Sequence, residues 1–200
     1  MHQKKRRLLI HIFTFILSLA SLTSAQAGAP LDLVRTSVES AVQILKDPSL
    51  VSPDRKQERV DRLREALDGM FDYQEMAKRA LGPHWRQRTA AEQQEFVKLF
   101  HDFLERVYSD KMNLYGGEKV RFGRELIDNE FAQVESTLIQ LKGDENTVIY
   151  KLRQVNGQWK VYDAVVENVS IINNYRSQFD RVISTSSYQE LVKRLREKVE

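Results

Sequence analysis

Hydrophobic residues alternate along a stretch rich in β-branched and aromatic side chains at 158–170. This alternation predicts a strand with two largely apolar faces. The two faces carry Trp159, Val161, Val165 and Val169 at odd positions, and Tyr162, Ala164 and Val166 at even positions. Such a strand is typical of one covered on both sides. Over 171–179 the apolar spacing changes to three and four residues, which predicts a helix directly after the strand.

Three further strands are predicted before that stretch, over 118–123, 131–141 and 147–155. A polar turn at 142–146 joins the second of these strands to the third. The pair Asn156-Gly157 leads into 158–170 and is a strong hairpin signal. Four strands joined by short turns predict an antiparallel meander.

The first half of the chain follows the 3.6-residue period of amphipathic helices. Apolar stripes predict helices over 31–46, from Ser52 to about Gly69, and through 73–80. A capping box, Thr89 with Glu92, opens the longest helix, and a second box, Ser187 with Glu190, opens a C-terminal helix. Helices followed by a meander indicate an α+β fold, with helices laid on a curved four-stranded antiparallel sheet.

The first 27 residues predict a secretory signal peptide. Basic residues at 4–7 precede a mostly apolar run at 8–22, and Ala25-Gln26-Ala27 is a small-x-small cleavage signal. The apolar run is shorter than the roughly 20 residues of a membrane-spanning helix, although an uncleaved anchor is an alternative. Because no cysteine follows the cleavage signal, a lipoprotein anchor is excluded.

We expect residues 28–200 to form a single domain. It is predicted to be helical over about 30–115, to form the sheet over about 118–170, and to be helical again over about 171–199. The complete lack of cysteine means that an exported domain must rest on its hydrophobic core, without disulfides.

Removing the leader changes the charge balance. The sequence has 31 Lys and Arg against 28 Asp and Glu, and four of the basic residues lie in the leader, which leaves 27 against 28 and a net charge of −1. The basic isoelectric point of the full chain is therefore no reason to expect nucleic-acid binding.

Few residues of the predicted domain offer catalytic chemistry. His84 lies in a predicted loop beside Trp85, where packing is the favoured role, and His101 is expected on the exposed side of the longest helix, next to Asp102. There is no nucleophilic cysteine and no metalloprotease, serine-hydrolase or nucleotide-binding motif. We therefore expect no catalytic residue, no bound metal and no enzymatic activity.

One pair of carboxylates needs separate consideration. Asp163 and Glu167 lie four residues apart and would share a face of the predicted strand. Two carboxylates can serve a hydrolase, but the favoured interpretation is that each pairs with a basic residue of a helix or caps a sheet edge. Arg176 is the candidate partner.

Several motifs of the chain point to a family. NNYRSQF at 173–179 follows VYD at 161–163 and is the most specific of them, with further segments at 71–86, 95–100 and 115–120. Together these segments resemble the MlaC family, also called the toluene-tolerance family, over nearly the whole chain after the leader. The resemblance implies a curved sheet similar to nuclear transport factor 2 domains, with an added helical lobe.

The same resemblance implies a periplasmic carrier of glycerophospholipid, concerned with outer-membrane lipid asymmetry. Its acyl tails would lie in an apolar cavity, with the head group facing solvent, and phospholipid would be cargo and not a cofactor. The implied partners are an inner-membrane ABC transporter with an MCE domain and an outer-membrane lipoprotein complex. We expect a monomer that does not bind nucleic acid.

The resemblance also suggests where lipid would bind. The expected cavity wall consists of Phe100, Phe103, Val107 and Tyr108 on the longest helix and Tyr150, Leu152, Tyr162, Ala164 and Val166 on the strands. From composition alone, an aromatic stripe at helical spacing is more typical of plain core. Three alternatives stay open: a carrier of another lipid, such as a hopanoid-associated relative; an enzyme using Asp163 or Glu167 in the cavity; and a protein-binding module with a solid core.

Overall fold

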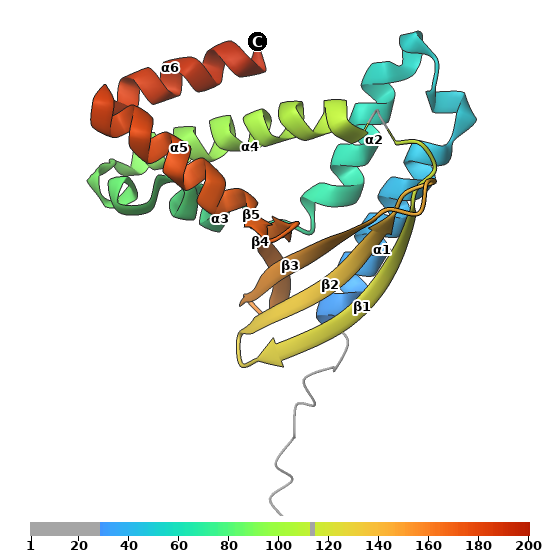
Figure 1. Cartoon of the computed structure of the whole chain (residues 1–200). Coiled ribbons are helices and arrows are strands. Elements are labelled where there is room, and N and C mark those ends of the chain that lie inside the picture. The colour runs from blue at the N-terminus through green and yellow to red at the C-terminus, as the bar shows by residue number, and fades with distance from the viewer. Residues whose placement is uncertain (1–28, 113–114) are drawn as a thin grey trace, which may run out of the picture.

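The computed structural model describes residues 29–112 and 115–200, so the predicted signal peptide lies outside the described part of the chain (Figure 1). The predicted α+β class is confirmed. Before the sheet the chain forms α1 (Ala29–Lys46), η1 (Pro48–Leu50), η2 (Pro53–Arg55), α2 (Lys56–Asp68), α3 (Tyr73–Leu81), η3 (Gly82–Gln87) and α4 (Ala90–Met112). The strands are β1 (Lys119–Asp128), β2 (Phe131–Ile139), β3 (Glu145–Val155), β4 (Gln158–Val166) and β5 (Val169–Ser170), followed by α5 (Ile171–Thr185) and α6 (Tyr188–Val199).

Local signals fix several of these boundaries. Thr89 and Glu92 exchange the two capping-box hydrogen bonds, with N···O distances of 2.8 and 3.2 Å, and the Ser187 hydroxyl accepts from the Glu190 N–H at 3.1 Å. Within 29–112 and 115–200, no helix is long and apolar enough to cross a membrane.

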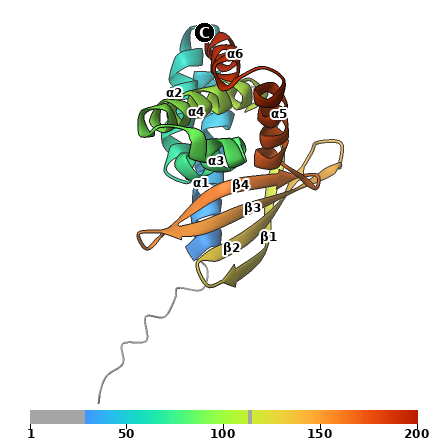
Figure 2. The same ribbon diagram turned by 90° about the vertical axis from the view of Figure 1, so that its left-hand side faces the viewer.

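The sheet is an antiparallel meander in the order β1-β2-β3-β4-β5, and Figure 2 shows β1 to β4 side by side. It has five strands and not the predicted four. The chain turns back at Glu167 and Asn168, whose φ angles of 49° and 63° are those of a tight two-residue hairpin turn. The predicted strand at 158–170 is therefore split into β4 and the two-residue β5.

A bulge in β4 changes which side chains share a face. The pairing runs Tyr150↔Ala164 and Lys151↔Asp163, then jumps to Leu152↔Val161, which leaves Tyr162 without a partner. An extra residue reverses the alternation from that point on. Val161 therefore shares its face with Ala164 and Val166, and the predicted division into odd and even faces is wrong.

Two hydrophobic clusters form the core. In the first, α3, α4, α5 and α6 pack around Phe96, Phe100, Tyr175 and Phe179, and these helices form the lobe at the upper left of Figure 1. In the second, α1 covers one face of the sheet, here called the inner face. The buried residues of this second cluster are Val34, Met70, Ala132, Val134, Leu152 and Val161.

Two connections join the helical lobe to β4. The segment between α2 and α3 pairs with the free edge of β4. The Asp72 N–H donates to the Val161 carbonyl and the Val161 N–H donates to the Met70 carbonyl, both at 2.8 Å. On the same strand, the Asp163 carboxylate accepts from the Ile172 N–H at 3.1 Å and from the Ser170 hydroxyl at 2.8 Å.

Asp163 thus holds the N-terminus of α5, where a negative charge is favoured. It is 5% exposed, and its basic neighbour is Lys151 of β3, at 3.6 Å, and not the expected Arg176. Glu167 is exposed and accepts from the Thr147 N–H at 3.2 Å. The favoured interpretation, a basic partner on a helix or a sheet-edge cap, does not hold for Asp163, although both carboxylates make structural contacts.

Replacing Asp163 by Asn should therefore destabilise the fold. The amide keeps the size of the carboxylate but loses its charge, so we expect the free energy of unfolding to fall by about 2–3 kcal/mol. Urea unfolding followed by tryptophan fluorescence measures this, and Glu167→Gln is the exposed control, expected within about 0.5 kcal/mol of the parent. Equal effects of the two substitutions would contradict the anchoring role.

Candidate functional site

A cavity of about 410 Å³ lies between the inner face of the sheet and helices α1, α2 and α4. This volume is within the usual range for small-molecule sites. The helices line it with the aliphatic residues Val38, Ala41, Val42, Leu45, Val60, Leu63, Leu67 and Leu104. The sheet contributes Val120, Ser136, Leu138, Val148, Tyr150, Ala164 and Val166. The cavity is therefore suited to an apolar ligand.

The position of the cavity follows from the two clusters of the core. Met76 and Leu104 belong to the helical cluster and Met70 to the cluster under α1, and all three reach the cavity. The space is thus the region where the two clusters do not meet. A second hollow of about 420 Å³ between α4 and α6 is lined mainly by charged residues such as Glu92, Glu95 and Arg196, and offers no comparable apolar wall.

Four of the nine residues predicted to form the cavity wall do line it: Tyr108, Tyr150, Ala164 and Val166. Burial raises the pKa of both tyrosine hydroxyls, and Ser136, beside Tyr150, partly offsets that rise. Both tyrosines are neutral at physiological pH. The small Ala164 side chain, opposite Tyr150 in the register, leaves room beside the tyrosine ring.

The predicted residues on α4 mostly lie elsewhere. Phe100 is fully buried and Phe103 packs edge-on to Tyr175 with ring centroids 5.4 Å apart, so both belong to the helical cluster. Val107 is half-buried and does not line the cavity. The reason is that α5 and α6 cover most of the aromatic face of α4, which leaves only its C-terminal end for the cavity.

Two predicted strand residues also lie outside the cavity. Leu152 faces inward but is fully buried in the cluster under α1. Tyr162 occupies the bulge, where its ring meets Phe131 at 6.3 Å and the Arg79 guanidinium at 4.2 Å. Of the nine residues predicted to line the cavity, only Tyr108, Tyr150, Ala164 and Val166 therefore do so.

Sequence reasoning missed the contribution of α1 and α2. Their apolar stripes were visible as ordinary amphipathic periodicity, which does not distinguish a face packed against core from a face along a cavity. The short aliphatic side chains of these stripes, such as Ala41 and Val60, were the only available signal.

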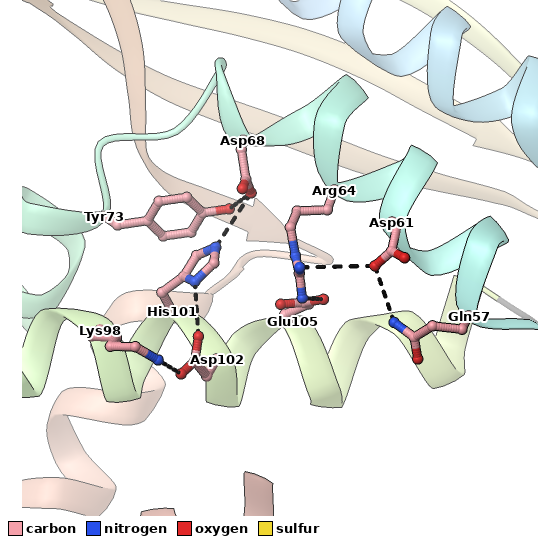
Figure 3. Close-up of polar contacts among 9 residues, drawn as sticks. All are labelled: Gln57, Asp61, Arg64, Asp68, Tyr73, Lys98, His101, Asp102 and Glu105. Carbon is pink, nitrogen blue, oxygen red and sulfur yellow. Dashed lines mark hydrogen bonds and ion pairs between the residues drawn. The ribbon is translucent and has the colours of Figure 1, made fainter.

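A polar contact region joins α2 to α4 beside the cavity, and we call it the α2–α4 seam (Figure 3). It comprises Arg64 and Asp68 on α2, His101 and Glu105 on α4, and Tyr73 of α3. Arg64 forms an ion pair with Glu105, and Asp68 accepts from the Tyr73 hydroxyl at 2.9 Å. Among the described residues that line the cavity, the charged side chains are Arg64, Asp68 and Glu105, all of this seam.

His101 is part of this seam and not the exposed surface residue that was predicted. Its Nε2 lies 3.3 Å from Asp68 Oδ1, its Nδ1 lies 3.2 Å from Asp102 Oδ1, and its ring stands edge-on to Tyr73 at 4.3 Å. The C-terminal end of α2 covers it, which the sequence of α4 alone does not reveal. The other predicted histidine, His84, bonds Asp180 through Nε2 at 2.8 Å.

Two seam residues, His101 and Glu105, form with the neighbouring Asp102 a group of side chains that could hold a cation. Burial alone would raise the pKa of the Asp102 carboxyl, but its bonds to Lys98 and His101 lower that pKa overall. The ammonium group of Lys98 is 2.6 Å from Asp102, and Arg64 pairs with Glu105. Because Lys98 already neutralises Asp102, only His101 and Glu105 would be left for a metal, which disfavours a metal there.

The carboxylates considered for catalysis do not face the cavity. Neither Asp163 nor Glu167 lines it, and the Asp163 oxygens accept bonds that hold α5. The geometry gives no support to the alternative of a hydrolase that uses this pair in the cavity.

Comparison with known proteins gives matches of three kinds: to a family model, to curated relatives and to solved structures. The sequence model of the family described as "MlaC protein" matches residues 35–197. The "Intermembrane phospholipid transport system binding protein MlaC" of Haemophilus influenzae is 26% identical over 124 residues, which are 60% of this chain and 58% of that relative. A phospholipid-binding protein from Ralstonia solanacearum, solved in complex with a phospholipid, superposes with a TM-score of 0.72 at 25% identity, covering 84% of this chain and 95% of that one.

A bulky residue at position 164 should close the cavity. We expect Ala164→Trp to weaken binding of a neutral apolar fluorophore by about tenfold or more, because the indole occupies the space beside Tyr150. Titration of protein freed of bound apolar molecules measures the affinity. Ala91→Trp, on the exposed start of α4, is the matched control, and equal affinity of both variants would show that the probe binds elsewhere.

Proposed function

The chain belongs to the MlaC family, and we propose that it is a non-enzymatic carrier of glycerophospholipid in the periplasm. The observation that carries this proposal is the apolar cavity between the sheet and helices α1, α2 and α4. The phospholipid bound by the Ralstonia solanacearum protein and the transport system named for the Haemophilus influenzae relative support it. The predicted leader and the absence of cysteine are consistent with a periplasmic location.

The energetics suit a shuttle. Burying one methylene group is worth about 0.8 kcal/mol, so a 16-carbon tail gains roughly 13 kcal/mol in an apolar cavity. A bilayer offers the same tail a similar gain. The net free energy of moving lipid between a membrane and the carrier can therefore be close to zero, and the carrier itself needs no energy source.

The empty state is the costly one. If the cavity of about 410 Å³ were sealed and dry, a cost of about 24 cal/mol per Å³ would amount to about 10 kcal/mol. That is comparable with the whole stability of a typical domain, about 5–15 kcal/mol. We therefore expect the protein either to hold lipid or to contract around the cavity.

The proposed partners are the two membrane complexes implied by the family. An inner-membrane ABC transporter with an MCE domain and an outer-membrane lipoprotein complex would each exchange lipid with the carrier, which acts as a monomer. No nucleic-acid partner is proposed.

Protein purified from the periplasm without detergent should contain glycerophospholipid. Mass spectrometry of an organic extract identifies it, and we expect the extracted protein to unfold at a temperature lower by about 5 °C or more, because ligand binding stabilises the folded state. Finding another lipid, such as a hopanoid, would change the proposed cargo. Finding no lipid, together with an unchanged melting temperature, would reject a carrier.

Lipid exchange should depend on the partner membrane. We expect a fluorescent phospholipid loaded into the protein to move to vesicles containing the MCE-domain transporter about tenfold faster than to plain vesicles, because docking raises the effective concentration of the acceptor. Fluorescence transfer measures both rates. Equal rates would contradict the proposed partner.

A further inference from the structure

Charged side chains border the cavity at one place within the described residues, the α2–α4 seam. Arg64 and Asp68 lie one turn apart on α2, and Glu105 faces them from α4 (Figure 3). Their side chains are 43%, 39% and 20% exposed, respectively. Each therefore contacts both the solvent and the apolar interior.

The partners of these side chains leave the seam with a defined charge. Arg64 pairs with Glu105 and lies 3.8 Å from Asp61, while Asp68 contacts the Tyr73 hydroxyl and the His101 ring. The cavity border carries one positive charge and two negative charges, and both signs are accessible from the cavity. This arrangement matches a molecule that has an apolar body and a head with both charges.

We propose that the α2–α4 seam binds the head group of the carried lipid, with Arg64 contacting the phosphate and Glu105 and Asp68 contacting a head-group ammonium. This inference rests on the proposed function. An amphipathic ligand with its tails among the aliphatic side chains places its polar end where polar partners exist, because burying an unpaired charge in the apolar part is costly. The partial exposure of the seam keeps the head group in contact with solvent.

The two kinds of contact have different consequences for specificity. Every glycerophospholipid has the phosphate, and the planar guanidinium of Arg64 can bond two phosphate oxygens at once. Only some head groups have an ammonium, and the two carboxylates attract those and repel an additional negative charge. The carrier therefore prefers zwitterionic, amine-bearing lipids to anionic lipids.

Glu105→Gln tests the preference. The protein is equilibrated with vesicles of equal parts phosphatidylethanolamine and phosphatidylglycerol, separated from them, and its bound lipids are measured by mass spectrometry. We expect the bound ratio to shift toward phosphatidylglycerol by about threefold, the size expected for partly exposed ion pairs. Asp68→Asn should shift the ratio in the same direction.

A matched control exists on the same helix. Glu95 of α4 also forms an ion pair with an arginine, Arg196 of α6, and its side chain is 49% exposed, but it does not line this cavity. Glu95→Gln removes a comparable ion pair and should leave the bound ratio unchanged.

Arg64→Gln separates the phosphate contact from the ammonium contact. Because both lipids have the phosphate, we expect it to speed the loss of both lipids to acceptor vesicles by a similar factor of about three or more. An unchanged rate would overturn the assignment of Arg64.

The inference and the proposed function fail in different ways. If the parent and both carboxylate variants hold lipid in the same ratio, the head-group site is overturned while the carrier function stands. If the parent protein takes up no lipid from the vesicles, the carrier function fails, and the head-group site fails with it.

Discussion

Hydrogen bonds on two residues of β4, Val161 and Asp163, hold the helical lobe at a fixed position relative to the sheet. The main chain of Val161 is bonded to the segment before α3, and the carboxylate of Asp163 is bonded to the first turn of α5. The bulge at Tyr162 lies between these two residues. Because buried backbone groups and a buried carboxylate are costly to leave unpaired, the lobe cannot simply slide inward until the two hydrophobic clusters meet.

This constraint explains why a chain without disulfides keeps a space inside it. Hydrophobic burial alone would favour closing the space between α1, α2, α4 and the sheet. The hydrogen bonds at β4 oppose that collapse. An apolar cargo in the cavity would instead supply packing contacts to the side chains that line it. In the proposed function, stability and cargo binding are therefore coupled, since the same apolar surface is satisfied by lipid or left open to water.

The wall of the cavity is of two kinds, and the difference matters for an amphipathic cargo. Side chains from the sheet and from α1 are aliphatic or neutral, including Tyr150, which burial keeps protonated. The crossing of α2 and α4 instead brings Arg64, Asp68 and Glu105 together at the border with solvent. The cavity thus has an apolar interior and a charged border. The lipid that we propose as cargo is divided in the same way, into apolar tails and a charged head group.

The sequence by itself determined most of the elements, their order and the family, because periodicity, capping boxes and the Asn156-Gly157 turn act over a few residues; the turn that separates β5 from β4 was missed. It also indicated a structural role for Asp163, although not its partner Lys151. Only the tertiary structure decided which apolar surfaces remain apart. Phe100 and Tyr108 belong to the same stripe of α4, yet one is core and the other lines the cavity, because α5 and α6 cover only part of that helix. A single inserted residue at Tyr162 reversed the faces of β4, and bulges of this kind depend on pairing with a neighbouring strand, which local pattern does not contain.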